Sequence, residues 1–291
     1  MPYSGLKYLI VGAGFFGSVI AREVADKQKE KVLVIDKRPH IAGNCFSKND
    51  AETGIQYHQY GPHIFHTSNE SIWDYVNRFA SFNHYRHRVF SKYKDQIYAM
   101  PINLGTINQF YGKTFHPDQA KAWIEQEKAN DFTESPQNLE EKAINLIGKP
   151  LYEAFIKGYT LKQWNTDPKN LPASIINRLP VRFNYKSDYF NDTWQGIPTR
   201  GYTKLFEGIF DSPYIDVQTN TDFFDIKDQI PSSTTIIYTG PIDRFFDYKF
   251  GVLGWRTVKF EHEIHSTGDY LGTAVMNYAD ADNPYTRAHE F

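Results

Sequence analysis

Residues 7–36 read KYLIVGAGFFGSVIAREVADKQKEKVLVID, and this stretch decides the fold. Lys7–Val11 is a short apolar run that is typical of a buried strand. A glycine-rich turn follows it. The pattern then predicts a helix over residues 18–28 and a second buried strand at Lys31–Ile35. A strand, a helix and a strand at this spacing predict a βαβ unit, from which parallel α/β sheets are built.

The turn contains the pattern Gly-x-Gly-x-x-Gly, formed by Gly12, Gly14 and Gly17, and Asp36 follows 19 residues after the last glycine. Such a pattern between a strand and a helix indicates a dinucleotide-binding site. Gly12 would permit the tight turn, Gly14 would let pyrophosphate approach the backbone, and Gly17 would let the helix pack on the strand. The helix start would offer N–H groups to the phosphates, and Asp36 would bind a ribose. The alternative is a glycine turn in an α/β domain that binds no nucleotide.

The segment after the second strand favours FAD over NAD. It contains Lys37 and Arg38, and then the small-residue turn Ala42-Gly43 followed by Asn44. An acidic strand end, an arginine and such a turn resemble flavoproteins of the glutathione-reductase and amine-oxidase type, in which this turn approaches the FAD phosphates. The usual doublet there is Gly-Gly, so Ala42 is a departure. The sequence has no second Gly-x-Gly-x-x-Gly for a separate nicotinamide domain.

The composition predicts a folded protein of a reducing compartment. The chain has 291 residues, enough for roughly two domains. Its 32 basic and 34 acidic side chains give a formal net charge of −2, so it lacks the basic footprint of a nucleic-acid-binding protein. The single cysteine, Cys45, excludes an internal disulfide and a cysteine-rich zinc site, and we expect no metal. We find no apolar run long enough for a membrane span and no secretory signal, and we therefore expect a cytoplasmic protein.

The rest of the chain predicts two regions interleaved with the α/β unit. The pattern turns helical beyond residue 117, where Asn138 and Glu141 have the spacing of a capping box. Val258–Ile264 and Tyr270–Tyr278 look like antiparallel strands. We therefore expect an α/β fold with a Rossmann-like FAD-binding domain, an inserted helical domain and an antiparallel β-sheet domain. The expected boundaries are 1–80 and 203–244 for the first domain, 103–177 for the second, and 81–102, 178–202 and 245–291 for the third.

A string of eight residues, Tyr60-Gly61-Pro62-His63-Ile64-Phe65-His66-Thr67, carries a more specific signal. A second string, GYTLKQW, occupies residues 158–164. Others follow in order: LPASIINRLPVRF at 171–183, QGIP at 195–198, IYTGPID at 237–243 and NPYTR at 283–287. Together they resemble the bacterial UDP-galactopyranose mutase family nearly from end to end.

The resemblance implies an isomerase that binds FAD and interconverts UDP-galactopyranose and UDP-galactofuranose. N5 of the reduced flavin would attack the anomeric carbon and form a covalent adduct as UDP leaves. The sugar would then reclose through a different hydroxyl before UDP returns, with no net oxidation. The cofactor would carry the hard chemistry while the protein places N5 and holds the leaving group. The family also implies a role in cell wall biosynthesis and a homodimer.

The resemblance assigns roles to individual residues. The expected catalytic residues are His63, beside the flavin, and Arg178 and Arg287, which would neutralise the diphosphate. The expected cofactor-binding residues are Gly12, Gly14, Phe16, Gly17, Asp36, Lys37, Arg38, Gly43, Asn44 and His63. The expected substrate-binding residues are Phe155, Tyr159, Thr160, Trp164, Arg178, Tyr189, Asn277 and Arg287.

Structural alternatives stand beside these roles. Phe155 and Tyr159, four residues apart on one helical face, would flank the uracil, but Phe155 suits an aromatic core nearly as well. Tyr189 would donate a hydrogen bond to the diphosphate or pack in the core. His63 would relay a proton near neutral pH or be satisfied by the backbone. Trp164 opens the segment that in the family is a mobile lid over the substrate.

The sequence also departs from the family. The family continues past the position of Phe291 with a tyrosine-bearing segment and a glycine-rich stretch before a helix, so we expect this chain to lack the family's C-terminal segment. The sequence would then be part of a longer enzyme or a truncated gene product with reduced activity. Two other functions stay open. One is an FAD-dependent oxidoreductase of the amine-oxidase type, and the other is an inactive truncated remnant that binds a UDP-sugar.

Overall fold

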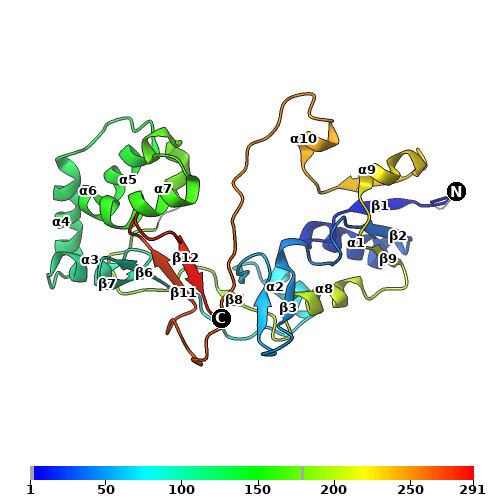
Figure 1. The fold of residues 1–291 in the computed structure, drawn as a ribbon, viewed down its shortest axis with the longest axis horizontal. Helices are drawn as coiled ribbons and strands as arrows, with labels where there is room; N and C mark the ends of the chain where they lie inside the picture. Colours follow the sequence, from blue (N-terminus) through cyan, green and yellow to red (C-terminus); the bar gives the residue numbers. More distant parts are fainter. Residues whose placement is uncertain (1–2, 178–179) are drawn as a thin grey trace. The chain divides into compact units, whose positions relative to one another are not determined.

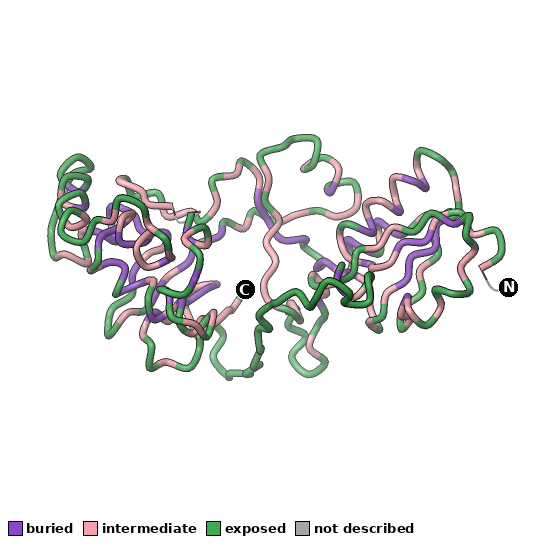
Figure 2. Tube along the Cα trace, turned by 90° about the horizontal axis from the view of Figure 1, so that it is seen from above, coloured by how far each residue is buried: buried purple, intermediate pink, exposed green. Residues whose placement is uncertain are grey.

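The computed structural model describes residues 3–177 and 180–291. The chain forms two compact units, each built from segments far apart in the sequence (Figure 1). Unit 1 comprises Met1–Tyr85 and Asp192–His262, and unit 2 comprises Arg86–Asn191 and Glu263–Phe291. Buried positions occur in both units, so each has a core of its own (Figure 2).

A parallel four-stranded sheet with the order β10-β1-β2-β9 forms the centre of unit 1. Its strands are β1 (Tyr8–Val11), β2 (Val32–Ile35), β9 (Ile215–Gln218) and β10 (Thr235–Tyr238). Helices α1 (Phe15–Gln28) and α8 (Tyr202–Phe210) pack together over one face of this sheet. All of β2 is buried, because a central parallel strand is covered on both faces. The predicted βαβ unit is confirmed, with its helix starting three residues earlier than expected.

Two antiparallel pairs and several short helices complete unit 1. The pairs are β3 (Ser47–Asn49) with β4 (Gln56–His58), and β5 (Phe65–Thr67) with β8 (Trp194–Gly196). The helices are α2 (Glu70–Asn77), α9 (Phe223–Ile226) and α10 (Ile242–Phe245), with 3-10 turns at Gly43–Cys45 and Lys227–Gln229. The pairing of β5 with β8 brings two of the family-like strings side by side.

Unit 2 combines a mixed sheet with a group of helices. The sheet has the order β12-β11-β6-β7, with β6 (Val89–Tyr93), β7 (Gln96–Met100), β11 (Val275–Tyr278) and β12 (Arg287–His289). The helices are α3 (Leu104–Tyr111), α4 (Pro117–Ala129), α5 (Leu139–Ile147), α6 (Lys149–Tyr152) and α7 (Gly158–Trp164). A π-helical turn at Glu153–Lys157 joins α6 to α7, and 3-10 turns follow at Pro168–Asn170 and Ala173–Ile176.

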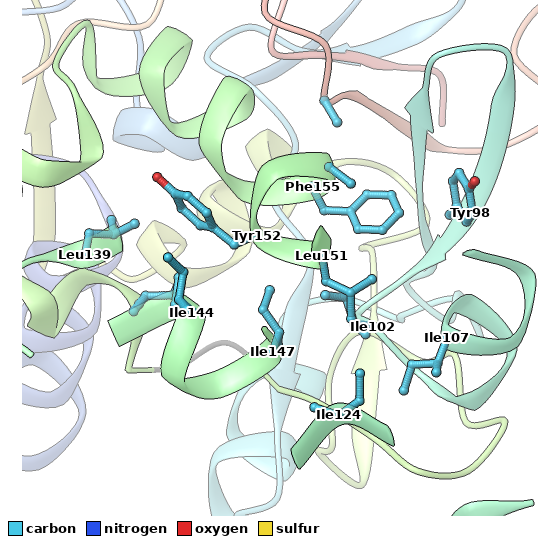
Figure 3. Packing of buried hydrophobic residues seen from close by; sticks show 14 of the residues in the cluster. Tyr98, Ile102, Ile107, Ile124, Leu139, Ile144, Ile147, Leu151, Tyr152 and Phe155 are labelled. Carbon is cyan, nitrogen blue, oxygen red and sulfur yellow. The ribbon is translucent and has the colours of Figure 1, made fainter. Parts of the chain in front are cut away.

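The helices and the sheet of unit 2 share one core. Tyr98 of β7 lies in the same cluster as Ile107, Ile124, Leu151 and Phe155 from the helices (Figure 3). The long apolar face of the helices is therefore buried against the sheet and against the neighbouring helices. The three domain boundaries drawn from the sequence stay a prediction.

The strand expected at Val258–Ile264 is wrong. Residues 251–265 have no regular secondary structure, and residues 251–270 are exposed throughout. Alternation of apolar and polar residues indicates a strand only where a second strand accepts its hydrogen bonds. Among the described residues, the strand pairings include none with this segment. The strand expected over Tyr270–Tyr278 forms only in its last four residues, as β11.

Candidate active site

The first part of the candidate site is a tight junction between β1 and α1 in unit 1. Gly12 has φ +112°, and a Cβ atom there would lie 2.0 Å from Thr239 Oγ1. A Cβ on Gly17 would lie 2.0 Å from the carbonyl oxygen of Gly12. These contacts leave room for no side chain at either position, so both glycines are required for the helix to begin directly after the strand.

A second turn lies against the first. Gly43 has φ +55°, and its missing Cβ would come within 3.0 Å of the Cα atom of Gly14. The N–H of Ala42 donates to the carbonyl of Ala13 at 2.9 Å and holds the two segments together. Gly14 is the N-cap of α1 and has no side chain to cap the first-turn N–H groups. Residues 12–17 and 42–44, called here the glycine turns, are thus suited to a phosphate group.

The other expected cofactor residues lie around the glycine turns in unit 1. Asp36 accepts hydrogen bonds from the N–H groups of Ala13 and Arg38, each at 2.9 Å, and so ties the end of β2 to the first turn. Arg38 donates to Asn44 Oδ1 at 2.9 Å. Lys37 is exposed, and Phe16 is 67% exposed in the first turn of α1. The role of Asp36 at a ribose stays a prediction, because its carboxylate oxygens here accept backbone hydrogen bonds.

His63 lies near these turns and has an unsatisfied ring nitrogen. Its Nε2 is buried and makes no hydrogen bond to the described residues. The backbone N–H of His63 donates to His58 Nδ1 at 3.0 Å. The centroid of the His63 ring lies 6.2 Å from that of the Tyr202 ring. Burial lowers the pKa of His63, so the imidazole is neutral at pH 7. A buried ring nitrogen without a partner is unusual, because buried polar atoms are nearly always hydrogen-bonded in folded proteins.

Sequence reasoning missed two residues around His63, namely His58 and Tyr202. Burial and the neighbouring His63 lower the pKa of His58 to about 4. Tyr202 is 1% exposed at the start of α8. The proximity of His58 to the string at 60–67 is the only signal that could have found it. Burial raises the pKa of Cys45 to about 12, which supports packing rather than nucleophilic chemistry for this thiol.

The second part of the candidate site lies in unit 2, where α7 meets the β11–β12 hairpin. Arg287 donates a hydrogen bond from Nη2 to the hydroxyl of Tyr159, and its guanidinium carbon lies 5.4 Å from the centroid of that ring. Asn277 is the direct cross-strand partner of Arg287, and its Oδ1 is buried without a hydrogen-bond partner among the described residues. Three expected substrate residues, called here the hairpin cluster (Tyr159, Asn277 and Arg287), therefore meet.

The remaining expected substrate residues have varied surroundings. Phe155 is 5% exposed, and the rings of Tyr98, Phe110 and Tyr93 lie 5.0 to 5.8 Å from it, so it forms part of the core (Figure 3). Thr160 is buried, and Trp164 is half-buried at the end of α7. Tyr189 is 45% exposed and donates its N–H to the carbonyl of His87. Arg178 lies outside the described residues.

The segment expected to be a lid begins at Trp164. Leu171 and Ile176 are buried in the core of unit 2, and the N–H of Leu139 donates to the carbonyl of Leu171 at 2.9 Å. Its movement over a substrate stays a prediction. Within residues 3–177 and 180–291, no group of three His, Cys, Asp or Glu residues is placed to hold a metal ion. No helix in the same ranges has the length and apolar character of a membrane span.

The fold and these residues define a class: an α/β protein with a Rossmann-like dinucleotide-binding unit and a second unit that carries an arginine–tyrosine–asparagine cluster. Comparison with known protein families supports this class. Residues 10–79 match the NAD(P)-binding Rossmann-like domain, and residues 154–291 match UDP-galactopyranose mutase.

Individual relatives lead to the same family. A probable UDP-galactopyranose mutase of Klebsiella pneumoniae is 49% identical over 282 residues, which cover 97% of this chain and 72% of that protein. A dTDP-fucopyranose mutase of Escherichia coli is 44% identical, with 98% and 76% covered. A crystal structure of reduced UDP-galactopyranose mutase has the same fold with a TM-score of 0.69 at 14% identity, covering 98% of this chain and 70% of that one. The chain belongs to the UDP-galactopyranose mutase family, whose members are isomerases, and the resemblance found in the sequence is confirmed.

Proposed function

We propose that this protein interconverts the pyranose and furanose forms of a nucleotide-linked sugar, with UDP-galactose as its substrate and FAD as its cofactor. The hairpin cluster is the observation that carries the proposal. It places a guanidinium, a phenol and an amide together, on two elements that are more than 110 residues apart in sequence. A diphosphate leaving group needs such fixed donors, because negative charge develops on it as the bond to the sugar breaks.

The residues of unit 1 fit a flavin dinucleotide. The glycine turns bring two backbone segments together without side chains between them, as the approach of a pyrophosphate requires. The buried Nε2 of His63 has no protein partner among the described residues and could bond a polar ring atom. Reduced FAD, when bound, would supply the nucleophilic N5 atom for the anomeric carbon of the sugar. His63, neutral at pH 7, would hold one hydrogen bond to the ring system and orient it.

The hairpin cluster supports the substrate half of the proposal. In the structure Arg287 uses one nitrogen on the Tyr159 hydroxyl and keeps further N–H donors for a phosphate oxygen. Tyr159 presents a half-buried ring at the start of α7, suited to stacking on a base. Arg178 would supply the second positive charge. Phe155, buried behind this region, would support the helix that carries Tyr159.

A second candidate substrate comes from a relative. The Escherichia coli protein with 44% identity is a dTDP-fucopyranose mutase, so the same reaction on a dTDP-linked 6-deoxy sugar is the alternative. The two substrates differ in the base, in the 2′-hydroxyl of the ribose and in the C6 hydroxyl of the sugar, and they share the diphosphate. The glycine turns and the hairpin cluster serve either one. A homodimer, a cytoplasmic location and a role in cell wall biosynthesis remain predictions.

Turnover of two sugars tests the proposal. The purified chain is supplied with FAD, reduced with dithionite and given UDP-galactofuranose or dTDP-fucofuranose, and the products are separated by chromatography. We expect the UDP sugar to react faster, and Arg287→Ala to abolish most of the activity while the exposed Arg200→Ala retains it. Faster reaction of the dTDP sugar would reassign the substrate. Binding of UDP without turnover of either sugar would favour the inactive remnant, and oxygen consumption with an amine would favour the oxidoreductase.

A further inference from the structure

Lys162 makes an unusual set of hydrogen bonds for a lysine on a helix. Its Nζ donates to the carbonyl oxygens of Tyr278, Asp280 and Tyr285 at 2.8, 2.7 and 2.8 Å. A lysine ammonium has three donors, so all of them are used on the backbone of a single hairpin. Such a group is not simply a solvated surface charge.

The three carbonyls lie on the connection between β11 and β12. Tyr278 ends β11, Asp280 follows it, and Tyr285 lies two residues before the start of β12. The N–H of Tyr278 donates to the carbonyl of Thr286 at 2.9 Å and closes the base of this connection. One ammonium therefore binds both ends of the connection that joins Asn277 to Arg287. The position of the Lys162 nitrogen fixes the spacing of the strand ends.

Helix α7 meets the hairpin closely at this point. A Cβ atom on Gly158 would lie 2.4 Å from the carbonyl oxygen of Ala279, so only glycine permits this contact. Tyr159 and Lys162 are three residues apart and share a face of the helix. Tyr159 accepts from Arg287 at one end of the contact, and Lys162 binds the connection at the other.

Two nearby carboxylates partly offset the cost of burying the Lys162 ammonium. Burial lowers the pKa of Lys162, while Asp280 and Asp282 on the same connection act in the opposite direction. The lysine also offsets the repulsion between these two carboxylates. A methylene chain without the ammonium would leave three carbonyls to find water and would remove the positive charge that interacts with Asp280 and Asp282.

We propose that Lys162 is a positioning residue for the diphosphate site: it fixes the β11–β12 hairpin on α7 so that Arg287 and Asn277 face Tyr159. The inference rests on the proposed function, since it assigns the hairpin cluster to the diphosphate. Lys162 itself contacts no reacting group. It acts through the backbone that carries Arg287.

Two measurements on the full chain test this role. Amide hydrogen exchange reports the protection of residues 275–289, and calorimetric titration with UDP reports affinity, without need of flavin or turnover. In Lys162→Met, which keeps the apolar stem, we expect faster exchange in the hairpin and about a tenfold rise in the Kd for UDP, because small displacements of a binding group have large effects. Lys162→Arg, which keeps the charge, should recover part of both. Lys157→Met, at an exposed lysine five residues earlier, should match the wild type.

The outcomes separate this inference from the proposed function. If Lys162→Met binds UDP as the wild type does, or if hairpin exchange is unchanged, Lys162 is not a positioning residue. A lower Tm with an unchanged Kd for UDP would mean that Lys162 stabilises the fold and does not position the binding residues. A wild-type chain that does not bind UDP would contradict the proposed function, and the positioning role with it. If Lys162→Met does not fold, Lys162→Gln, which keeps an N–H donor but loses reach and charge, is compared with Lys162→Arg in the same way.

Discussion

The glycine turns and the hairpin cluster are built in different ways. The turns come from one stretch of about 35 residues, in which a strand, a helix and a second strand follow directly. The hairpin cluster joins Tyr159 of α7 to Asn277 and Arg287 on β11 and β12. A site of the first kind is encoded by local spacing. A site of the second kind exists only when distant segments pack correctly, and its geometry depends on supports such as Lys162.

The largest effect is expected at the glycine turns. Gly17→Ala places a methyl group 2.0 Å from the carbonyl oxygen of Gly12. Because backbone must move to accept it, we expect a loss of about 3 kcal/mol in the free energy of unfolding. Urea unfolding followed by circular dichroism measures this loss. Gly254→Ala, where no atom lies within 4 Å, is the matched control, and equal stability of the two variants would contradict the tight junction.

A substitution in the hairpin cluster should change the affinity for UDP rather than the free energy of unfolding. Arg287→Ala removes a charged donor, so we expect the Kd for UDP to rise about 10- to 100-fold, with the unfolding midpoint nearly unchanged. Calorimetric titration measures the affinity. The exposed Arg200 of unit 1 provides the control variant Arg200→Ala. A loss of stability without a loss of affinity would mean that Arg287 serves the fold alone.

The dependence of stability on pH tests the histidine pair next to the glycine turns in unit 1. Burial and His63 lower the pKa of folded His58 from 6.5 to about 4. Between these values the unfolded chain binds a proton that the folded chain does not, so stability is lost as the pH falls from 6.5 towards 4. We expect His58→Gln to reduce the loss between pH 7 and pH 5 by about 2 kcal/mol. Urea unfolding at both pH values checks this, with exposed His84→Gln as the control. An unchanged pH slope in His58→Gln would show that His58 is not the group responsible.

The smallest effect is expected in the helices of unit 2, away from the hairpin cluster. Asn138 Oδ1 accepts a hydrogen bond from the N–H of Glu141 at 3.0 Å and caps α5. Asn138→Ala should cost about 1 kcal/mol of stability, whereas Asn138→Ser should be nearly neutral. Thermal unfolding measures both variants. Equal losses in the two would show that the cap does not stabilise the helix.

Local sequence predicted what depends on neighbouring residues. The βαβ unit, the tight turn at Gly12 and the N-cap at Asn138 each follow from residues that are close together in the sequence. The strand expected at Val258–Ile264 was wrong because alternation does not supply a hydrogen-bonding partner. The sequence could not show that Phe155 is buried among other rings or that His58 lies against His63. These facts depend on which distant segments pack together.

The hairpin cluster also could not be predicted from local sequence. Tyr159, Asn277 and Arg287 were candidates only because their strings resemble those of a known family. Nothing in the spacing of these residues predicts that they meet, and Lys162 carried no signal of its own although it lies within one of those strings. Its importance appears only in the three carbonyls that surround its nitrogen.

The most direct test of the central claim is the dependence of sugar turnover on the state of the flavin. The chain is loaded with FAD and given UDP-galactofuranose, with and without dithionite, while UDP-galactopyranose and the flavin absorbance are recorded together. We predict turnover only when the flavin is reduced, with no net consumption of reducing equivalents per sugar converted. Conversion that consumes oxygen or reductant in proportion to product would contradict the account, and so would a flavin-loaded chain that binds UDP but never converts the sugar.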